Sequence, residues 1–119
     1  MIVNDQAVKQ RILSALSDEY SLQILTATTQ HTLSALELSR NCEIPVTSLY
    51  RRLDALIDAG LIAVAKYGRT PDGKWYELYR SLLSRVDVSF NDGDLRMNVE
   101  VNNDLSDRFT RMWTSVPPI

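Results

Sequence analysis

Apolar residues recur every three or four positions through the first half of the chain, which is the spacing of helices that bury one face. A first helix is predicted to end near Ser17, with Asn4 or Asp5 as its N-terminal cap. The residues on its apolar face are Val8, Ile12, Leu13 and Leu16. Asp18 then begins a second helix, and the polar residues 30–32 follow it as a connection. The apolar contacts of this second helix come from Tyr20, Leu22, Ile24 and Leu25.

Short local signals place the next two helices. Ser34 and Glu37 form a capping box, in which the side chain of each accepts a hydrogen bond from the backbone of the other. A third helix is therefore predicted from there to about Asn41. Pro45 suits the opening of a fourth helix, because the backbone donors of a first helical turn are unpaired in any case. Gly60 is expected to end that helix, since glycine accepts the left-handed conformation common at helix C-termini.

Beyond residue 60 the apolar positions change from helical spacing to the alternation typical of strands. Residues 61–67 and 74–80 predict one hairpin, around a turn at residues 68–73. A second hairpin follows, because apolar residues alternate with polar ones on both sides of a turn at residues 91–94. Its alternating apolar residues are Val86, Val88, Phe90, Leu95, Met97, Val99 and Val101.

No repeat or low-complexity linker divides the 119 residues, which predicts a single domain of the α+β class. An N-terminal helix occupies residues 1–17, the central helices and first hairpin occupy 18–80, and a second hairpin with a last helix occupies 81–119. Asn103 or Asp104 can cap this last helix. Its apolar residues are Leu105, Phe109, Met112 and Trp113. We expect them to cover the second hairpin or to meet a second subunit.

Helix, short turn, helix and hairpin follow one another in the order of a winged helix-turn-helix. Residues 34–62 resemble, without a gap, the arsenic-repressor-like (ArsR) and related winged-helix regulators, and the resemblance covers about residues 15–80. The positions that carry it are Ser34, Glu37, Leu38, Ile44, Leu49, Arg51, Leu53, Leu56, Ala59, Gly60 and Leu61. Residues 44–53 look most like the archaeal members. The resemblance implies a helical bundle with a β-hairpin wing, and a transcription regulator that binds DNA.

Three residues depart from the usual pattern of that family, namely Glu43, Pro45 and Arg52, without changing the logic of the fold. The departure that matters concerns metals. The metal-sensing members carry cysteine pairs or His/Asp clusters, whereas this chain has one cysteine, Cys42, and one histidine, His31. We therefore expect no metal site and no cofactor. Cys42 stands where the family has an apolar turn residue, which favours a buried structural thiol over a redox switch.

Composition narrows the class of protein further. No stretch approaches the ~20 apolar residues that span a bilayer, and a lone cysteine fits a reducing cytoplasmic setting. No phosphate-binding glycine loop, nucleophile elbow or spaced carboxylate pair is present, so we expect no enzyme. The net charge of −2 is unevenly distributed, because residues 46–85 carry a net charge of +3. A polyanion such as DNA would meet this part of the chain first.

The fourth helix is predicted to present two different faces. At about 100° per residue, one face carries the apolar residues Leu49, Leu53, Leu56 and Ile57. Thr47, Ser48 and Arg51 project from the opposite side of the first two turns, with Tyr50 and Arg52 beside them. Arg51 is the best candidate for a bidentate contact to a guanine edge, and the two hydroxyls suit phosphates or base edges. The alternative for both arginines is a solvated helix surface.

In the first hairpin, Arg69 and Lys74 flank the turn and are candidates for contacts to a DNA backbone or minor groove. Asp72 in the same turn weakens that case, and a solvated turn is the alternative. The aromatic strand residues that follow are Trp75, Tyr76 and Tyr79. We expect these to be core residues rather than platforms on which bases stack.

The leading interpretation is a sequence-specific transcription regulator that binds double-stranded DNA as a homodimer, at a pseudo-palindromic operator. Repression is the expected outcome, and the dimer surface is expected on the first and last helices. The alternative is a winged-helix module that binds another protein in a transcription complex, which the acidic pI of about 5.3 favours. No small-molecule effector can be named from the sequence.

Overall fold

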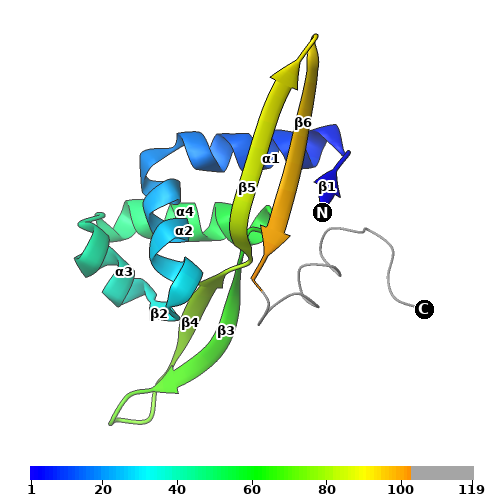
Figure 1. The fold of residues 1–119 in the computed structure, drawn as a ribbon. Coiled ribbons are helices and arrows are strands. Elements are labelled where there is room, and N and C mark those ends of the chain that lie inside the picture. Colours follow the sequence, from blue (N-terminus) through cyan, green and yellow to red (C-terminus); the bar gives the residue numbers. More distant parts are fainter. Residues whose placement is uncertain (103–119) are drawn as a thin grey trace.

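A computed structural model describes residues 1–102 of the chain as four helices and six strands (Figure 1). The helices are α1 (Gln6–Ser17), α2 (Glu19–Gln30), α3 (Ala35–Cys42) and α4 (Val46–Asp58). The strands are β1 (Ile2–Val3), β2 (Leu33–Ser34), β3 (Ile62–Arg69), β4 (Trp75–Ser81), β5 (Leu83–Asn91) and β6 (Asp94–Val101). The last helix predicted from the sequence lies outside the described residues. The predicted α+β arrangement of a helical bundle and two hairpins is confirmed.

The helix boundaries follow from the caps that the sequence predicts. Asp5 accepts hydrogen bonds from the backbone N–H groups of Ala7 and Val8, at 2.8 and 3.2 Å. The capping box at the start of α3 is formed in full, with Ser34 and Glu37 bonded in both directions at 3.1 and 3.2 Å. Gly60 follows α4 with a φ of +76°, as expected of a helix-ending glycine.

The turn between α3 and α4 is closed by hydrogen bonds around one left-handed residue. Glu43 adopts a φ of 54° and ends α3. The backbone N–H of Ile44 donates to the carbonyl of Ser39 at 3.1 Å, and the Ser39 hydroxyl donates to the carbonyl of Ile44 at 2.6 Å. Pro45 lies one residue earlier than predicted, as the N-cap of α4, where its missing N–H again costs no hydrogen bond. The turn thereby fixes the direction in which α4 leaves α3.

The six strands form two three-stranded antiparallel sheets, ordered β2-β4-β3 and β1-β6-β5. The first contains the hairpin that follows α4, with a bulge between Val64 and Lys66. The second contains the longer hairpin, whose register closes at Asn91 and Asp94. The sequence patterns missed the two edge strands β1 and β2, because two residues are too few to show alternation. The two hairpins extend in opposite directions from their junction (Figure 1).

The junction between the hairpins is a single residue, Leu82, which is fully buried. Its backbone N–H donates to the carbonyl of Leu61, and its own carbonyl accepts from Asn102, both at 2.9 Å. On either side of it, the Ser81 hydroxyl donates to the carbonyl of Leu83 at 2.7 Å and accepts from the N–H of Leu83 at 3.1 Å. These bonds hold the bend between β4 and β5 in one conformation.

One hydrophobic core joins all four helices to the inner parts of both sheets. Its fully buried large side chains are Ile12, Ile24, Leu38, Ile44, Leu49, Leu53, Leu61, Ile62, Leu82, Met97 and Val99. Ile12 had been expected on a dimer surface of the first helix, but it is buried within the chain itself. It faces inward because α1 packs its apolar face toward its own core. No helix within residues 1–102 is long and apolar enough to cross a membrane.

Candidate nucleic-acid interface

Helix α4 separates its apolar and polar residues as the sequence predicts. Leu49 and Leu53 are buried in the core, where they fix the rotation of the helix about its axis. On the outward side, Thr47, Tyr50 and Arg51 are exposed, whereas Ser48 is half-buried. The helix therefore presents a hydroxyl, a phenol and a guanidinium from its first two turns. This set can donate hydrogen bonds to phosphates and base edges.

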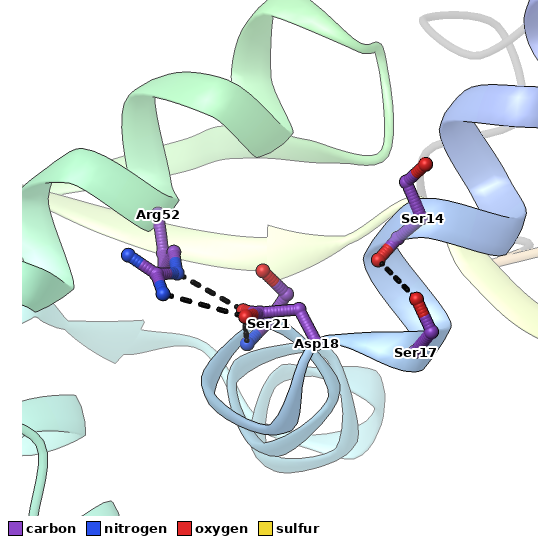
Figure 2. A network of polar contacts seen from close by, with 5 residues as sticks. All are labelled: Ser14, Ser17, Asp18, Ser21 and Arg52. Atoms are coloured by element: carbon purple, nitrogen blue, oxygen red, sulfur yellow. Dashed lines mark hydrogen bonds and ion pairs between the residues drawn. The ribbon is translucent and has the colours of Figure 1, made fainter.

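The neighbouring arginines Arg51 and Arg52 lie in different surroundings. Within residues 1–102, no hydrogen bond or ion pair engages the exposed Arg51 side chain. Arg52, in contrast, donates from Nε and Nη2 to the two carboxylate oxygens of Asp18, at 3.0 and 3.3 Å (Figure 2). Its guanidinium also lies 5.6 Å from the centre of the Tyr20 ring. The structure therefore does not bring Arg52 together with the other predicted DNA-binding residues of α4.

The Asp18–Arg52 pair connects the start of α2 to α4. Asp18 is the N-cap of α2 and also accepts from the backbone N–H of Ser21 at 2.9 Å (Figure 2). The hydrogen bond from Arg52, followed by that from Ser21, lowers the pKa of Asp18 to about 2. The same bond to Asp18 raises the pKa of Arg52. Both groups are thus charged across the physiological range, and the bidentate pair fixes how α4 sits against α2.

The tip of the β3–β4 hairpin is organised around Thr70. The Thr70 N–H donates to the carbonyl of Lys74 at 2.8 Å, and the Thr70 hydroxyl accepts from the Lys74 N–H at 2.9 Å. The same hydroxyl donates to the carboxylate of Asp72. Asp72, which weakened the case for a DNA contact, is therefore directed toward its own turn. Arg69 and Lys74 are exposed on either side of it.

The aromatic residues of β4 divide between core and surface. Tyr79 is buried with 6% of its surface exposed, which confirms the prediction for that residue. Trp75 and Tyr76 are 65% and 42% exposed, so the prediction that they are core residues is wrong. The reason is the length of the hairpin, because only the inner end of β4 reaches the helices (Figure 1). The guanidinium of Arg69 lies 5.0 Å from the centre of the Trp75 ring, an arrangement that favours attraction between cation and ring.

A groove of about 630 Å³ separates the start of α3 and the helix α4 from the hairpin. The residues that line it include Glu37, Tyr50, Thr70, Trp75, Glu77 and Tyr79. The hydroxyl of Tyr79 donates to Glu77 at 2.8 Å. Burial, and then this hydrogen bond, raise the pKa of Tyr79. The sequence patterns missed this groove, because its residues are far apart in the chain and meet only after folding.

The surroundings of Cys42 and His31 bear on whether these side chains could take part in metal or redox chemistry. Cys42 is half-buried, and its thiol lies 3.9 Å from the carbonyl of Gln23. Burial raises the pKa of the Cys42 thiol, which keeps it protonated and weakly reactive. His31 is exposed where α2 ends. Among residues 1–102, no group of three or more His, Cys, Asp or Glu side chains could hold a metal ion.

Comparison with known families agrees with this geometry. Residues 16–65, from the end of α1 to the middle of β3, match the family described as a helix-turn-helix domain. Because β3 and β4 follow this domain directly as a hairpin, the fold is a winged helix-turn-helix, as predicted. Together the domain and the wing support a DNA-binding transcription regulator.

Among solved structures, the chain is similar to HlyU from Vibrio cholerae, with 19% sequence identity and a TM-score of 0.45. That match covers 92% of this chain and 95% of the other. No curated protein sequence matches the chain. Within the matched residues, α3 and α4 are the first and second helices of the helix-turn-helix.

Proposed function

We propose that the protein is a sequence-specific transcription regulator that binds double-stranded DNA through the first two turns of α4. The observation that carries the proposal is the contrast between Arg51 and Arg52. Arg52 is bonded to Asp18, whereas Arg51 is exposed on the recognition helix and engages no partner within residues 1–102. An arginine that is held outward with its five donors available suits the O6 and N7 atoms of a guanine.

The neighbouring residues provide contacts that position the helix. Thr47 and Ser48 lie on the first turn of α4 and suit phosphate oxygens or base edges. Tyr50 is half-exposed on the adjacent surface and offers a hydroxyl and a ring. Acidic residues lie further along the helix, so we expect the N-terminal end to enter the major groove. Arg52 acts indirectly, since it fixes α4 against α2 rather than facing the DNA.

The wing provides the second set of proposed contacts. Arg69 and Lys74 flank a turn whose only acidic residue, Asp72, is bonded to Thr70. In a winged helix-turn-helix whose α4 lies in the major groove, these two cations are placed to reach the adjacent phosphates or the minor groove. Such contacts raise affinity for any sequence, whereas Arg51 discriminates between sequences.

We further propose a homodimer that represses transcription from a pseudo-palindromic operator in the cytoplasm, as in the ArsR-like regulators, archaeal members included, that residues 34–62 resemble. A two-fold dimer places two recognition helices on successive major-groove faces. Because Ile12 is buried, the apolar residues that α1 can contribute to such a dimer are its partly buried ones, namely Val8, Leu13 and Leu16. Analytical ultracentrifugation at micromolar concentration should show a dimer, and a monomer would overturn this part of the proposal.

The test is a selection of genomic fragments with the purified protein near 0.15 M salt, run beside the variants Arg51→Ala and Arg51→Lys. The expected result is a two-fold symmetric motif that the wild-type protein enriches. Arg51→Ala should weaken binding to it by about 1–3 kcal/mol, because the guanine contact is lost. Arg51→Lys should also fail at that base, since lysine keeps the charge but not the fork of donors.

Arg96→Ala is the matched control, because Arg96 is an exposed arginine on β6, away from the proposed interface. It should bind the motif as the wild type does. Circular dichroism should show the same fold for all variants. If no motif is enriched, or if Arg51→Ala binds as tightly as Arg96→Ala, the proposal fails. A winged-helix module that binds protein would then be the better account.

A further inference from the structure

The groove between α3, α4 and the wing has the dimensions of a small-molecule site. Its volume of about 630 Å³ lies within the usual range for such sites, roughly 300–1,000 Å³. One wall is the strand β4, from which Trp75, Glu77 and Tyr79 line the groove. These three alternate along the strand, so their side chains share one face of it. Tyr50 of α4 and Glu37 of α3 line the opposite wall.

The charge of this lining is negative. Two carboxylates, Glu37 and Glu77, line the groove, and no lysine or arginine among residues 1–102 does so. Each carboxylate accepts a hydrogen bond from a neutral donor, Glu37 from the Ser34 N–H at 3.1 Å and Glu77 from the Tyr79 hydroxyl at 2.8 Å. Neither bond neutralises the charge. The lining residues therefore carry a net charge of −2, although the surfaces on both sides of the groove are the ones proposed to meet DNA.

The aromatic residues add a second, independent preference for a cation. Trp75 already holds a guanidinium over its ring, at 5.0 Å from the ring centre, and remains 65% exposed. The faces of Trp and Tyr rings attract cations, most strongly where water is excluded. The positive end of the α3 dipole does not oppose this preference, because the capping box satisfies it with the Glu37 carboxylate. Rings and carboxylates together suit an ammonium or phosphonium group that carries apolar substituents.

We propose that this groove is a binding site for an organic cation with an aromatic or aliphatic body. The proposal also deepens the proposed function and rests on it in one respect. Tyr50 and Thr70 belong both to the groove and to the elements proposed to face DNA, so a bound cation competes with the DNA for them. By linkage, each ligand lowers the affinity of the protein for the other by the same factor.

The first experiment needs no DNA. The full chain is titrated with tetraphenylphosphonium and, separately, with tetraphenylborate, which has nearly the same shape and the opposite charge. Binding is followed by calorimetry and by ¹H–¹⁵N correlation spectra. Saturable binding of the phosphonium, with shifted resonances in residues 34–37 and 70–79, is the expected result. Equal binding of both ions, or shifts that centre elsewhere, would overturn the proposal.

Matched variants identify the residues that hold the probe. Trp75→Ala should weaken phosphonium binding about fivefold, because one aromatic face is lost. Phe90→Ala removes an aromatic side chain of similar exposure from the other hairpin and should change nothing. Glu77→Gln should weaken binding several-fold, whereas Glu100→Gln, the same change at an exposed position of β6, should not. If each variant behaves like its control, the groove is not the site.

The coupling to DNA is measured last, so that the two proposals fail separately. Phosphonium should weaken binding of the selected motif, and Trp75→Ala should reduce this effect. If phosphonium binds in the groove and the protein enriches no DNA motif, the site stands and the DNA-binding function fails. If a motif is enriched and Arg51→Ala loses it while phosphonium does not bind, the function stands and the cation site fails. Simultaneous binding without antagonism would overturn the proposed competition.

Discussion

The wing, β3–β4, and the second hairpin, β5–β6, differ most in the charge and order of their tips. Residues 66–75 of the wing carry a net charge of +2, whereas residues 85–96 of the second hairpin carry −1. The wing turn is held by the side chain of Thr70, and its cations flank it. The turn of the second hairpin is acidic, with Asp92 and Gly93 in left-handed conformations.

The arginines of the two hairpins also differ in their partners. In the second hairpin, Arg85 and Arg96 each form an ion pair with an aspartate of their own strand, both at 3.0 Å. In the wing, the Arg69 guanidinium lies over an aromatic ring, and no hydrogen bond or ion pair within residues 1–102 engages its side chain. Two hairpins that look alike as alternating patterns therefore have different chemistry. Charge and partners at the tip, rather than the hairpin itself, distinguish a nucleic-acid contact from a structural arm.

The largest expected effect concerns the buried half of the second hairpin. Met97 is 1% exposed, whereas its cross-strand partner Val88 is 45% exposed. Met97→Ala should lower the free energy of unfolding by about 2–5 kcal/mol, because it leaves a cavity in the core. Val88→Ala should cost well under this, since the side chain is half in water already. Urea denaturation checks both, and equal losses would show that the hairpin does not pack as described.

The next effect separates the arginines of the two tips. The double variant Arg69→Ala/Lys74→Ala should weaken DNA binding about tenfold at physiological salt and reduce the slope of log affinity against log salt by about 2. The double variant Arg85→Ala/Arg96→Ala removes as much charge from the second hairpin and should leave both quantities unchanged. Fluorescence anisotropy at several salt concentrations makes the measurement. An equal loss in both double variants would mean that DNA responds to net charge alone.

A third prediction compares the effects of one substitution in the turn of each hairpin on stability and on DNA binding. Gly93 has a φ of +80°, so Gly93→Ala should cost about 1 kcal/mol of stability. Thr70→Val keeps the shape of the side chain but removes its hydrogen bonds in the wing turn, at a cost of about 1 kcal/mol. We expect only Thr70→Val to weaken DNA binding, because it alone displaces Arg69 and Lys74. Thermal unfolding and anisotropy on the same samples distinguish the two outcomes.

The smallest expected effect is the pH dependence of the stability that the ion pairs of Asp18 and Asp87 contribute. The pKa of Asp18 is lowered from 3.8 to about 2, so the stability it contributes is complete above about pH 4 and is lost as the pH falls through 2. Asp18→Asn keeps a residue that can cap α2 and should be less stable than the wild type above pH 4. This difference should shrink between pH 4 and pH 2. Asp87→Asn, in an exposed pair of the second hairpin, should show no such trend.

Local signals in the sequence predicted most of the helical half and both hairpins. Asp5, Ser34 and Glu37 cap helices through hydrogen bonds to partners that lie within three residues of them in the chain. The turn at Asp92 and Gly93 is local in the same way. The edge strands β1 and β2 are not, since they form only when the distant strands β6 and β4 are in place. Interactions within one turn are thus readable from the sequence, and those between distant segments are not.

The candidate site shows the same division. The outward positions of Thr47, Tyr50 and Arg51 follow from the helical period and the apolar face of α4. The pairing of Arg52 with Asp18 could not be predicted, because it joins residues 34 positions apart. Nor could the exposure of Trp75, since the sequence does not show how far a hairpin extends past the helices. The first removes Arg52 from the residues proposed to meet DNA, and the second makes Trp75 available to the proposed cation site.

The junction at Leu82 connects the two hairpins through a single residue, without a linker. A flexible linker between them would let each move independently of the other. Here the chain passes from β4 to β5 through one buried residue whose backbone is bonded to Leu61 and Asn102. The direction of the proposed DNA-contacting tip relative to the second hairpin therefore depends on the backbone bonds of one buried residue.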